Sequence, residues 1–303
     1  MSERIRPGER VEVTEVGPRD GLQNEKVVPS TAAKIAFIEA LVDAGARQIE
    51  VGSFVSPRWV PAMADSEAVF AGLTRQPGVR YLALVPNQHG YQRAVAAGCD
   101  AVAVFTAASE GFARANINTT IAQSLSEFRG LAAQARAEGV AVRGYVSTVF
   151  ACPYDGPTRP EQVVPVVEEL LAMGCYEVSL GDTIGVGTPS HVERLLDAVL
   201  ARVPAECVVM HFHDTWGMGA ANAWRALELG VRRFDASAGG LGGCPFAKVA
   251  TGNVATEDLL YLFANAGLET GYDLAKVARA VRGLAGLLDH PLASRVHKAL
   301  GPV

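Results

Sequence analysis

Long apolar runs and clusters of positive charge are both missing from this chain of 303 residues. No apolar stretch approaches the roughly 20 residues that a membrane-spanning helix needs, so we expect no membrane span. The formal net charge is -5 and no block of lysine or arginine occurs, which argues against a nucleic-acid partner or an anionic membrane surface. Small anionic substrates remain compatible with this charge.

Paired cysteines are also missing. The five cysteines are odd in number and widely spaced, with no CxxC motif, so the sequence indicates neither a disulfide framework nor a thiolate zinc site. The N-terminal segment MSERIRPGER has no apolar core of the kind that a secretory signal carries. We therefore expect a cytoplasmic protein with free thiols.

What the sequence does contain is a regular alternation of short apolar runs and longer helical stretches, about every 30 residues. Eight runs rich in valine, isoleucine and aromatic residues predict strands, at 11–17, 47–53, 80–86, 100–107, 140–147, 176–182, 207–214 and 232–238. Helix signals lie between them. Ser30 is a candidate N-cap, Thr188 with Pro189 opens another helix, and Gly45, Gly98 and Gly174 are candidate left-handed helix ends.

Eight strands that are each followed by a helix predict a (β/α)8 TIM barrel, with the functional residues at the C-terminal ends of the strands. The alternative is a doubly wound open sheet, but no GxGxxG motif follows the first strand, where GPRDG stands instead. Residues 271–303 lie beyond the eighth unit, and we interpret them as additional C-terminal helices packed on the barrel. The prediction is a single catalytic domain over residues 1–303.

Two histidines one residue apart, His211 and His213, end the seventh predicted strand. On a strand, residues i and i+2 point to the same face, so the two imidazoles would be presented to one point in space. This geometry favours metal binding over the alternative of one core and one exposed histidine.

Other polar residues gather where the predicted strands end, and a barrel would bring them to one mouth. They are Arg19, Asp20, Glu50, Ser53, Arg143, Tyr145, Ser147, Asp182, Asp214, Cys244 and Asn253. Each has a structural alternative, such as an ion pair in a turn for Arg19 and Asp20 or a helix N-cap for Asn253. The glycine-rich run GGLGGCP at 239–245 matches no phosphate-binding motif, and a lid hinge or a way of presenting Cys244 are its two plausible interpretations.

These residues together predict a mixed nitrogen and oxygen metal site. His211, His213 and Asp20 would supply ligands, with the amide oxygen of Asn253 as a further candidate, and Mg²⁺ or Mn²⁺ is as credible there as Zn²⁺. Such a cation acts as a Lewis acid on a substrate hydroxyl, and Arg19 could stabilise an enolate oxygen. These are the parts needed to cleave a carbon–carbon bond next to a carbonyl.

The sequence resembles the hydroxymethylglutaryl-CoA lyases, which belong to the metal-dependent lyase, aldolase and synthase barrels. The matching strings run along almost the whole chain: VGPRDGLQNE (16–25), GSFVSPRWVPAMAD (52–65), AASEGFARANIN (107–118), RGYVS (143–147), GCYEVSLGDTIGVGTP (174–189), HFHDTWGMGAAN (211–222) and GGLGGCPFA with TGNVATED (239–258). The arginine–aspartate start and the HxH pair are shared by the barrel enzymes at large, whereas GLGGCP is the mark of the lyases.

The resemblance implies cleavage of 3-hydroxy-3-methylglutaryl-CoA to acetyl-CoA and acetoacetate, the last step of leucine breakdown. It implies an acyl-CoA substrate, a homodimer, and a divalent metal on Asp20, His211, His213 and Asn253. Catalytic roles fall to Arg19, Glu50, Asp182, His211 and Cys244. Substrate-binding candidates are Arg19, Ser53, Tyr145, Ser147, Ser179 and Thr183.

Two positions depart from the family pattern, because Thr106 and Val249 stand where the family usually has glycine. We expect Thr106 to narrow the mouth and Val249 to stiffen the loop that carries Cys244. The substrate could then be a related branched 3-hydroxyacyl-CoA, such as citramalyl-CoA or an isoprenoid-extended glutaryl-CoA. A Claisen-type synthase or aldolase and a non-catalytic acyl-CoA binder are weaker alternatives, since synthases usually carry a long C-terminal extension and every ligand position is present here.

Overall fold

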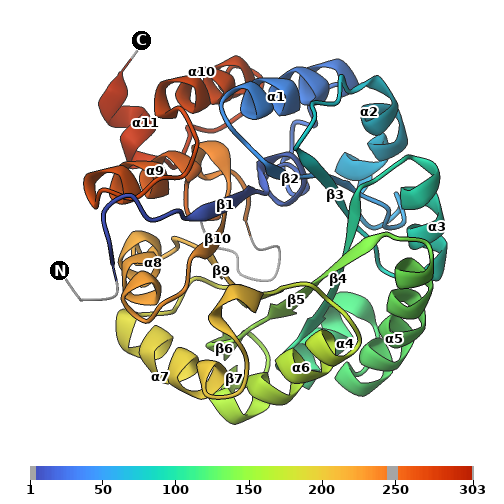
Figure 1. Cartoon of the computed structure of the whole chain (residues 1–303). Coiled ribbons are helices and arrows are strands. Elements are labelled where there is room, and N and C mark those ends of the chain that lie inside the picture. The colour runs from blue at the N-terminus through green and yellow to red at the C-terminus, as the bar shows by residue number, and fades with distance from the viewer. Residues whose placement is uncertain (1–4, 244–251, 302–303) are drawn as a thin grey trace.

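Parallel strands close into a barrel at the centre of the computed structural model, which describes residues 5–243 and 252–301 (Figure 1). The strands follow one another around the barrel in the order β1-β10-β9-β8-β5-β4-β3-β2. Their bounds are β1 Glu12–Glu15, β2 Gln48–Ser53, β3 Arg80–Leu84, β4 Ala101–Ala107, β5 Ala141–Ser147, β8 Val178–Asp182, β9 Val208–Phe212 and β10 Arg233–Ala236. Each falls within one of the eight predicted runs, so the predicted (β/α)8 barrel is confirmed.

Helices surround the barrel and cover its outer face, which explains the nearly continuous apolar character of the strands. The helices are α1 Thr31–Asp43, α2 Ser66–Gly72, α3 Gln88–Ala96, α4 Glu110–Ile117, α5 Ile121–Ala137, α6 Pro160–Ala172, α7 Pro189–Leu200, α8 Gly219–Glu228, α9 Thr256–Asn265, α10 Leu274–Ala285 and α11 Arg295–Leu300. Short helical turns lie at η1 Gly17–Gly21, η2 Pro61–Met63, η3 Ala205–Cys207 and η4 Ala238–Gly240. A small antiparallel pair, β6 Ala151–Cys152 with β7 Gly156–Pro157, follows β5.

The additional C-terminal helices are present as expected. Helix α10 packs against α1 and α9, and α11 packs against α9, on the outside of the barrel (Figure 1). None of the helices in the described part of the chain is long and apolar enough to cross a membrane.

The capping residues and glycines in the sequence predicted several helix ends correctly. The hydroxyl oxygen of Ser30 accepts a hydrogen bond from the backbone N–H of Ala33 (3.3 Å), as an N-cap does, and Pro189 is the first residue of α7. Gly45, Gly98 and Gly174 all have the positive φ predicted for them. Asn253 is not a helix cap, because α9 begins three residues later with Ala255 at its N-cap.

Gly45 combines a positive φ (117°) with a close backbone contact, since an added Cβ would lie 2.3 Å from the carbonyl oxygen of Gly271. Gly139 ends α5 with a φ of 73° but has open space around it. We expect Gly45→Ala to lower Tm well beyond Gly139→Ala. The left-handed backbone costs about 1–2 kcal/mol at either position, and overpacking adds about 1–3 kcal/mol at Gly45 alone. Thermal melts followed by circular dichroism measure the difference, and equal shifts in Tm would contradict it.

Candidate active site

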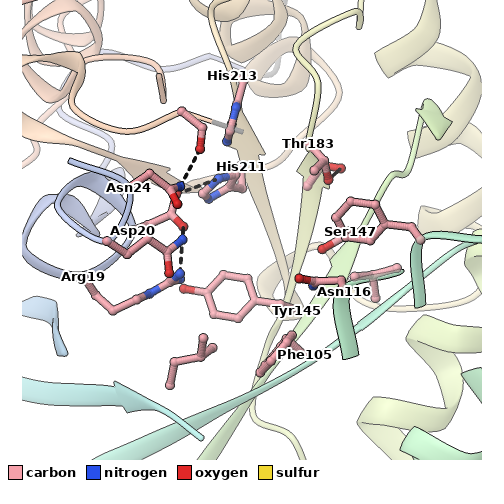
Figure 2. A pocket seen from close by; sticks show the side chains of 16 residues that line it. Arg19, Asp20, Asn24, Phe105, Asn116, Tyr145, Ser147, Thr183, His211 and His213 are labelled. Atoms are coloured by element: carbon pink, nitrogen blue, oxygen red, sulfur yellow. Dashed lines mark hydrogen bonds and ion pairs between the residues drawn. The ribbon is translucent and has the colours of Figure 1, made fainter. Parts of the chain in front are cut away.

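A pocket opens at the C-terminal ends of the barrel strands, where the polar residues were expected to meet (Figure 2). Its cavity volume is about 170 Å³. Seven of the predicted site residues line it: Arg19, Asp20, Tyr145, Ser147, Thr183, His211 and His213. The strand ends therefore converge as a TIM barrel requires.

Arg19 and Asp20 lie in the turn η1, directly after β1. The guanidinium of Arg19 is buried between two carboxylates: its Nε lies 2.6 Å from Oε2 of Glu50, and its Nη1 lies 2.7 Å from Oδ1 of Asp20. Burial alone would raise the pKa of Asp20, but the charges of Arg19 and the two histidines outweigh it and lower the pKa to about 2. Asp20 is therefore a carboxylate at any physiological pH.

The histidine pair lies where the sequence predicted it, with the two ring centroids 5.4 Å apart. His211 is on β9 and His213 follows the strand, bridged to Asn253 in backbone pairing. The side chains of Asp20, His211 and His213 offer three ligand atoms that all lie within 4.8 Å of one another. These three residues come from two distant segments and form a plausible metal-binding group.

Asn253 completes this group. Its Nδ2 donates to Oδ2 of Asp20 (2.8 Å) and to the carbonyl oxygen of Leu241 (3.1 Å). Its Oδ1 is buried and has no hydrogen-bond partner among the described residues. A buried amide oxygen without a partner is costly unless a ligand satisfies it, so the donor set fits a divalent cation that accepts oxygen and imidazole ligands.

A second layer of charged residues holds His211 in place. Nδ1 of His211 lies 3.2 Å from Oδ2 of Asp235, which also accepts a hydrogen bond from Ser179 (2.8 Å). Burial would raise the pKa of Asp235, but Arg143, 2.6 Å from its Oδ1, lowers it. An ionised Asp235 can only accept, so Nδ1 of His211 carries the proton and Nε2 is left to face Asp20.

The two histidines differ in their electrostatic setting. Burial would lower the pKa of His211, but Asp235 raises it, which makes the imidazole a stronger ligand. Burial and the neighbouring His211 lower the pKa of His213 to about 4, so its ring is neutral at pH 7. Neutral imidazole is the form that binds metals.

The two buried arginines are joined through Tyr145. Its hydroxyl lies 2.6 Å from Nη1 of Arg143 and donates to Oε2 of Glu50 (3.3 Å), the carboxylate that holds Arg19. Arg143 also pairs with Glu177, Nε to Oε1, at 2.8 Å. The predicted catalytic residue Glu50 is thus buried and contacts Arg19 directly and Arg143 through Tyr145.

Besides Glu50 and Asn253, three predicted site residues lie outside the pocket lining of the described chain. Ser179 contacts Asp235 inside the barrel, and Ser53 is buried with its hydroxyl on the carbonyl oxygen of Leu84 (3.4 Å). The carboxylate of Asp182 accepts the backbone N–H groups of Val186 and Gly187 at 3.1 and 2.8 Å. Burial raises the pKa of Asp182 to about 6 despite these hydrogen bonds.

The expectation that Thr106 narrows the mouth is wrong. Its hydroxyl lies 2.8 Å from that of Ser124 on α5, so the side chain faces outward. Strand alternation instead turns the neighbouring Phe105 toward the pocket (Figure 2). The other departure, Val249, lies outside the described residues, as does the predicted catalytic residue Cys244.

Several pocket residues were not singled out from the sequence: Gln23, Asn24, Leu84, Phe105, Phe112, Asn116, Val146, Gly181 and Gly243. Asn24 is the most informative, because its Nδ2 donates to the carbonyl oxygen of Gly243 (2.8 Å) at the start of the glycine-rich loop. Its place four residues after Asp20 in the string GPRDGLQNE was the available signal. Gly242 is needed close by, since a Cβ there would lie 2.7 Å from Nδ2 of Asn253.

Comparison with known proteins agrees with this site. The HMGL-like family matches residues 10–283. The chain is 52% identical to the 3-hydroxy-3-isohexenylglutaryl-CoA/hydroxy-methylglutaryl-CoA lyase of Pseudomonas aeruginosa, covering 96% of this chain and 97% of the relative. It is 50% identical to the mitochondrial hydroxymethylglutaryl-CoA lyase of Bos taurus, over 96% and 89% of the two chains.

A solved structure is similar over its whole length. The HMG-CoA lyase of Acinetobacter baumannii, in complex with coenzyme A and 3-methylmalate, superposes with a TM-score of 0.92. It is 39% identical and covers 97% of this chain and 98% of its own. By its sequence, its barrel and its relatives, the chain belongs to the hydroxymethylglutaryl-CoA lyase family and is a carbon–carbon lyase.

Proposed function

We propose that the chain cleaves 3-hydroxy-3-methylglutaryl-CoA to acetyl-CoA and acetoacetate with the aid of a divalent cation. The observation that carries this proposal is the meeting of Arg19, Asp20, His211 and His213 in one pocket, with Asn253 hydrogen-bonded to Asp20. In a retro-Claisen cleavage the C3 hydroxyl loses a proton, the C2–C3 bond breaks, and the thioester enolate takes up a proton. The close relatives named for this activity support the assignment.

Asp20, His211, His213 and Asn253 are the residues that would hold the cation. Mg²⁺ or Mn²⁺ suits the oxygen ligands, and Zn²⁺ also accepts this donor set. When bound, the cation supplies Lewis-acid chemistry, because it lowers the pKa of a substrate hydroxyl. The ionised Asp20 and the neutral His213 are already in the protonation states that ligands need.

Arg19 is the proposed site of enolate stabilisation. Its guanidinium is fixed by Glu50 and Asp20 and lines the pocket, so its charge needs no reorganisation when negative charge develops on the thioester oxygen. Tyr145, Ser147 and Thr183 line the same pocket and are proposed to bind the substrate. Cys244, which follows Gly243, is proposed to take part in proton transfer to the enolate carbon.

Three further properties follow the family resemblance. We propose that the enzyme binds acyl-CoA, works in the cytoplasm, and assembles as a homodimer of single-domain subunits. A relative crystallised with coenzyme A supports the first of these. Relatives named as cytoplasmic and as mitochondrial enzymes both occur, so the compartment needs a direct localisation experiment.

The function is tested by assaying metal-stripped protein on 3-hydroxy-3-methylglutaryl-CoA before and after adding Mg²⁺ or Mn²⁺. We expect both acetyl-CoA and acetoacetate to form, and only after metal is restored. Following the two products separately excludes simple thioester hydrolysis, which would release coenzyme A and no acetoacetate. Failure of any metal to restore turnover of this substrate would refute the proposal.

Substitutions separate the roles of the arginine and the histidines. We expect Arg19→Met to lower kcat by about 10²–10³-fold or more while metal stays bound, because the charge on the enolate is lost but no ligand is. His211→Ala and His213→Ala should lose metal as well. Metal content by mass spectrometry is the readout, with Arg202→Met on the outer surface as the control. Equal occupancy in all these variants would contradict the ligand assignment.

A second substrate is favoured by the apolar part of the pocket. Leu84, Phe105 and Phe112 line it, and the relative from Pseudomonas aeruginosa is named for an isohexenyl as well as a methyl substrate. We therefore propose that 3-hydroxy-3-isohexenylglutaryl-CoA competes as a substrate, with Phe105 limiting the length of the C3 substituent.

Phe105→Ala should raise kcat/KM for the isohexenyl substrate relative to the methyl substrate by about tenfold, since each added methylene in an apolar pocket is worth about 1–3 kcal/mol. Thr106→Ser is the matched control, because its side chain faces α5 and not the pocket. Steady-state kinetics on both thioesters give the ratio. An unchanged ratio in the Phe105 variant would remove this residue from substrate selection.

A further inference from the structure

A second cavity, of about 400 Å³, lies at the opposite end of the barrel from the active site. The residues that line it belong to the beginnings of β1, β2 and β3 and to the turns around them, including Glu12, Gln48 and Arg80. The active-site pocket is instead lined by residues at the ends of the strands. The two cavities share no lining residue.

Three arginines, Arg10, Arg47 and Arg80, line this second cavity, although the chain as a whole carries a net negative charge. None of the three pairs with a carboxylate among the described residues. The cavity is therefore lined by three guanidinium groups that have no carboxylate partner in the described part of the chain, against two carboxylates, Glu12 and Asp100.

The two carboxylates that line the cavity are already engaged by arginines from outside its lining. Glu12 lies 3.5 Å from Arg233, and Asp100 lies 3.5 Å from Arg75. Asp100 also accepts the backbone N–H of Tyr81 at 2.9 Å. These pairs leave the positive charge of the cavity in excess.

Neutral contacts hold two of the arginines in position. Arg80 donates to Oε1 of Gln48 (3.2 Å) and lies over the ring of Tyr176, 4.9 Å from its centroid. Arg47 donates to the carbonyl oxygen of Ala46 (3.3 Å). Each guanidinium has five N–H donors, so most of the donors remain free for a ligand.

We propose that this cavity binds a small phosphate-bearing molecule. Guanidinium groups bind phosphate through paired hydrogen bonds, and a phosphate dianion would match three arginines that line one cavity better than a single carboxylate does. The volume suits a ligand of the size of a phosphorylated metabolite. This proposal does not depend on the reaction at the other end of the barrel.

The coenzyme A portion of an acyl-CoA bound in the active site cannot be the occupant. The interior of the barrel between the two cavities is filled by the buried side chains of Arg143, Glu177 and Asp235, which are less than 3% exposed. A ligand in the second cavity is therefore a separate molecule.

The test is calorimetric titration of the Mg²⁺-loaded full chain with inorganic phosphate at constant ionic strength. We expect the triple variant R10Q/R47Q/R80Q to raise the Kd for phosphate at least tenfold. The control variant R194Q/R202Q/R279Q removes the same charge from α7, the turn after α7 and α10, and should stay within twofold of the parent. Turnover of the acyl-CoA substrate should be the same in all three proteins, which separates this site from the active site.

Two outcomes would overturn the proposal. The first is the same phosphate affinity, or no phosphate binding, in the parent and the triple variant, since any phosphate bound would then lie elsewhere. The second is tighter binding of succinate than of phosphate, which would assign the cavity to dicarboxylates. Arg47→Gln alone, with a smaller expected loss of affinity, keeps the test decisive if the triple variant fails to fold.

Discussion

The buried guanidinium of Arg19 is the group on which the active-site geometry depends. It is held by Glu50 from β2 and by its neighbour Asp20, so the first turn of the barrel is fastened to the second strand. Removing one partner of a buried ion pair typically costs about 3–5 kcal/mol, because the remaining charge is left without compensation. The position of Asp20, and with it the metal-binding group, therefore depends on Glu50, a residue outside that group.

A chain of hydrogen bonds and ion pairs also connects Glu50 across the barrel to His211. Glu50 accepts a hydrogen bond from Tyr145, Tyr145 contacts Arg143, and Arg143 pairs with Asp235, which holds His211. At this end of the barrel three carboxylates, Asp20, Glu50 and Asp235, meet two guanidinium groups. The excess of negative charge favours a cation beside Asp20. The network that orients the candidate ligands therefore also makes the site selective for positively charged ligands.

Periodicity in the sequence was sufficient to predict the eight strands, and the spacing of His211 and His213 was sufficient to pair them. What alternation does not predict is which inward-facing side chains reach the pocket. Ser179 and Tyr145 are paired on neighbouring strands, but the hydroxyl of Ser179 donates to Asp235, whereas the side chain of Tyr145 lines the pocket. Asp235 was not predicted as a site residue, because it is a charged residue inside a short strand and not at a predicted strand end.

Contacts between loops could not be predicted from the sequence either, because they join segments that are distant in the chain. Asp182 ends β8 as expected. Its carboxylate accepts hydrogen bonds from the backbone N–H groups of Val186 and Gly187 in the following turn, a role that no sequence motif predicts. Asn253 had both a metal ligand and a helix cap as sequence-based interpretations, and its contact with Asp20, 233 positions away in the chain, decides against the cap.

The glycine-rich loop is anchored by a buried carboxylate that the sequence did not suggest. Glu15, at the end of β1, accepts the backbone N–H groups of Gly17 and Ala238 and the hydroxyl of Thr256, so the turn with Arg19 and the start of the loop share one acceptor. Burial raises the pKa of Glu15 to about 7, and its three donors favour the ionised form.

Gly243 and Gly252, on either side of the glycine-rich segment, both lie beside the metal-binding group. Asn24 holds the carbonyl of Gly243, and the carbonyl oxygen of Gly252 accepts the backbone N–H of Asp214, next to His213. Gly243 is therefore held at the rim of the pocket by Asn24, which follows the turn that carries Arg19 and Asp20, and this contact supports the proposed proton-transfer role of the next residue in the sequence, Cys244.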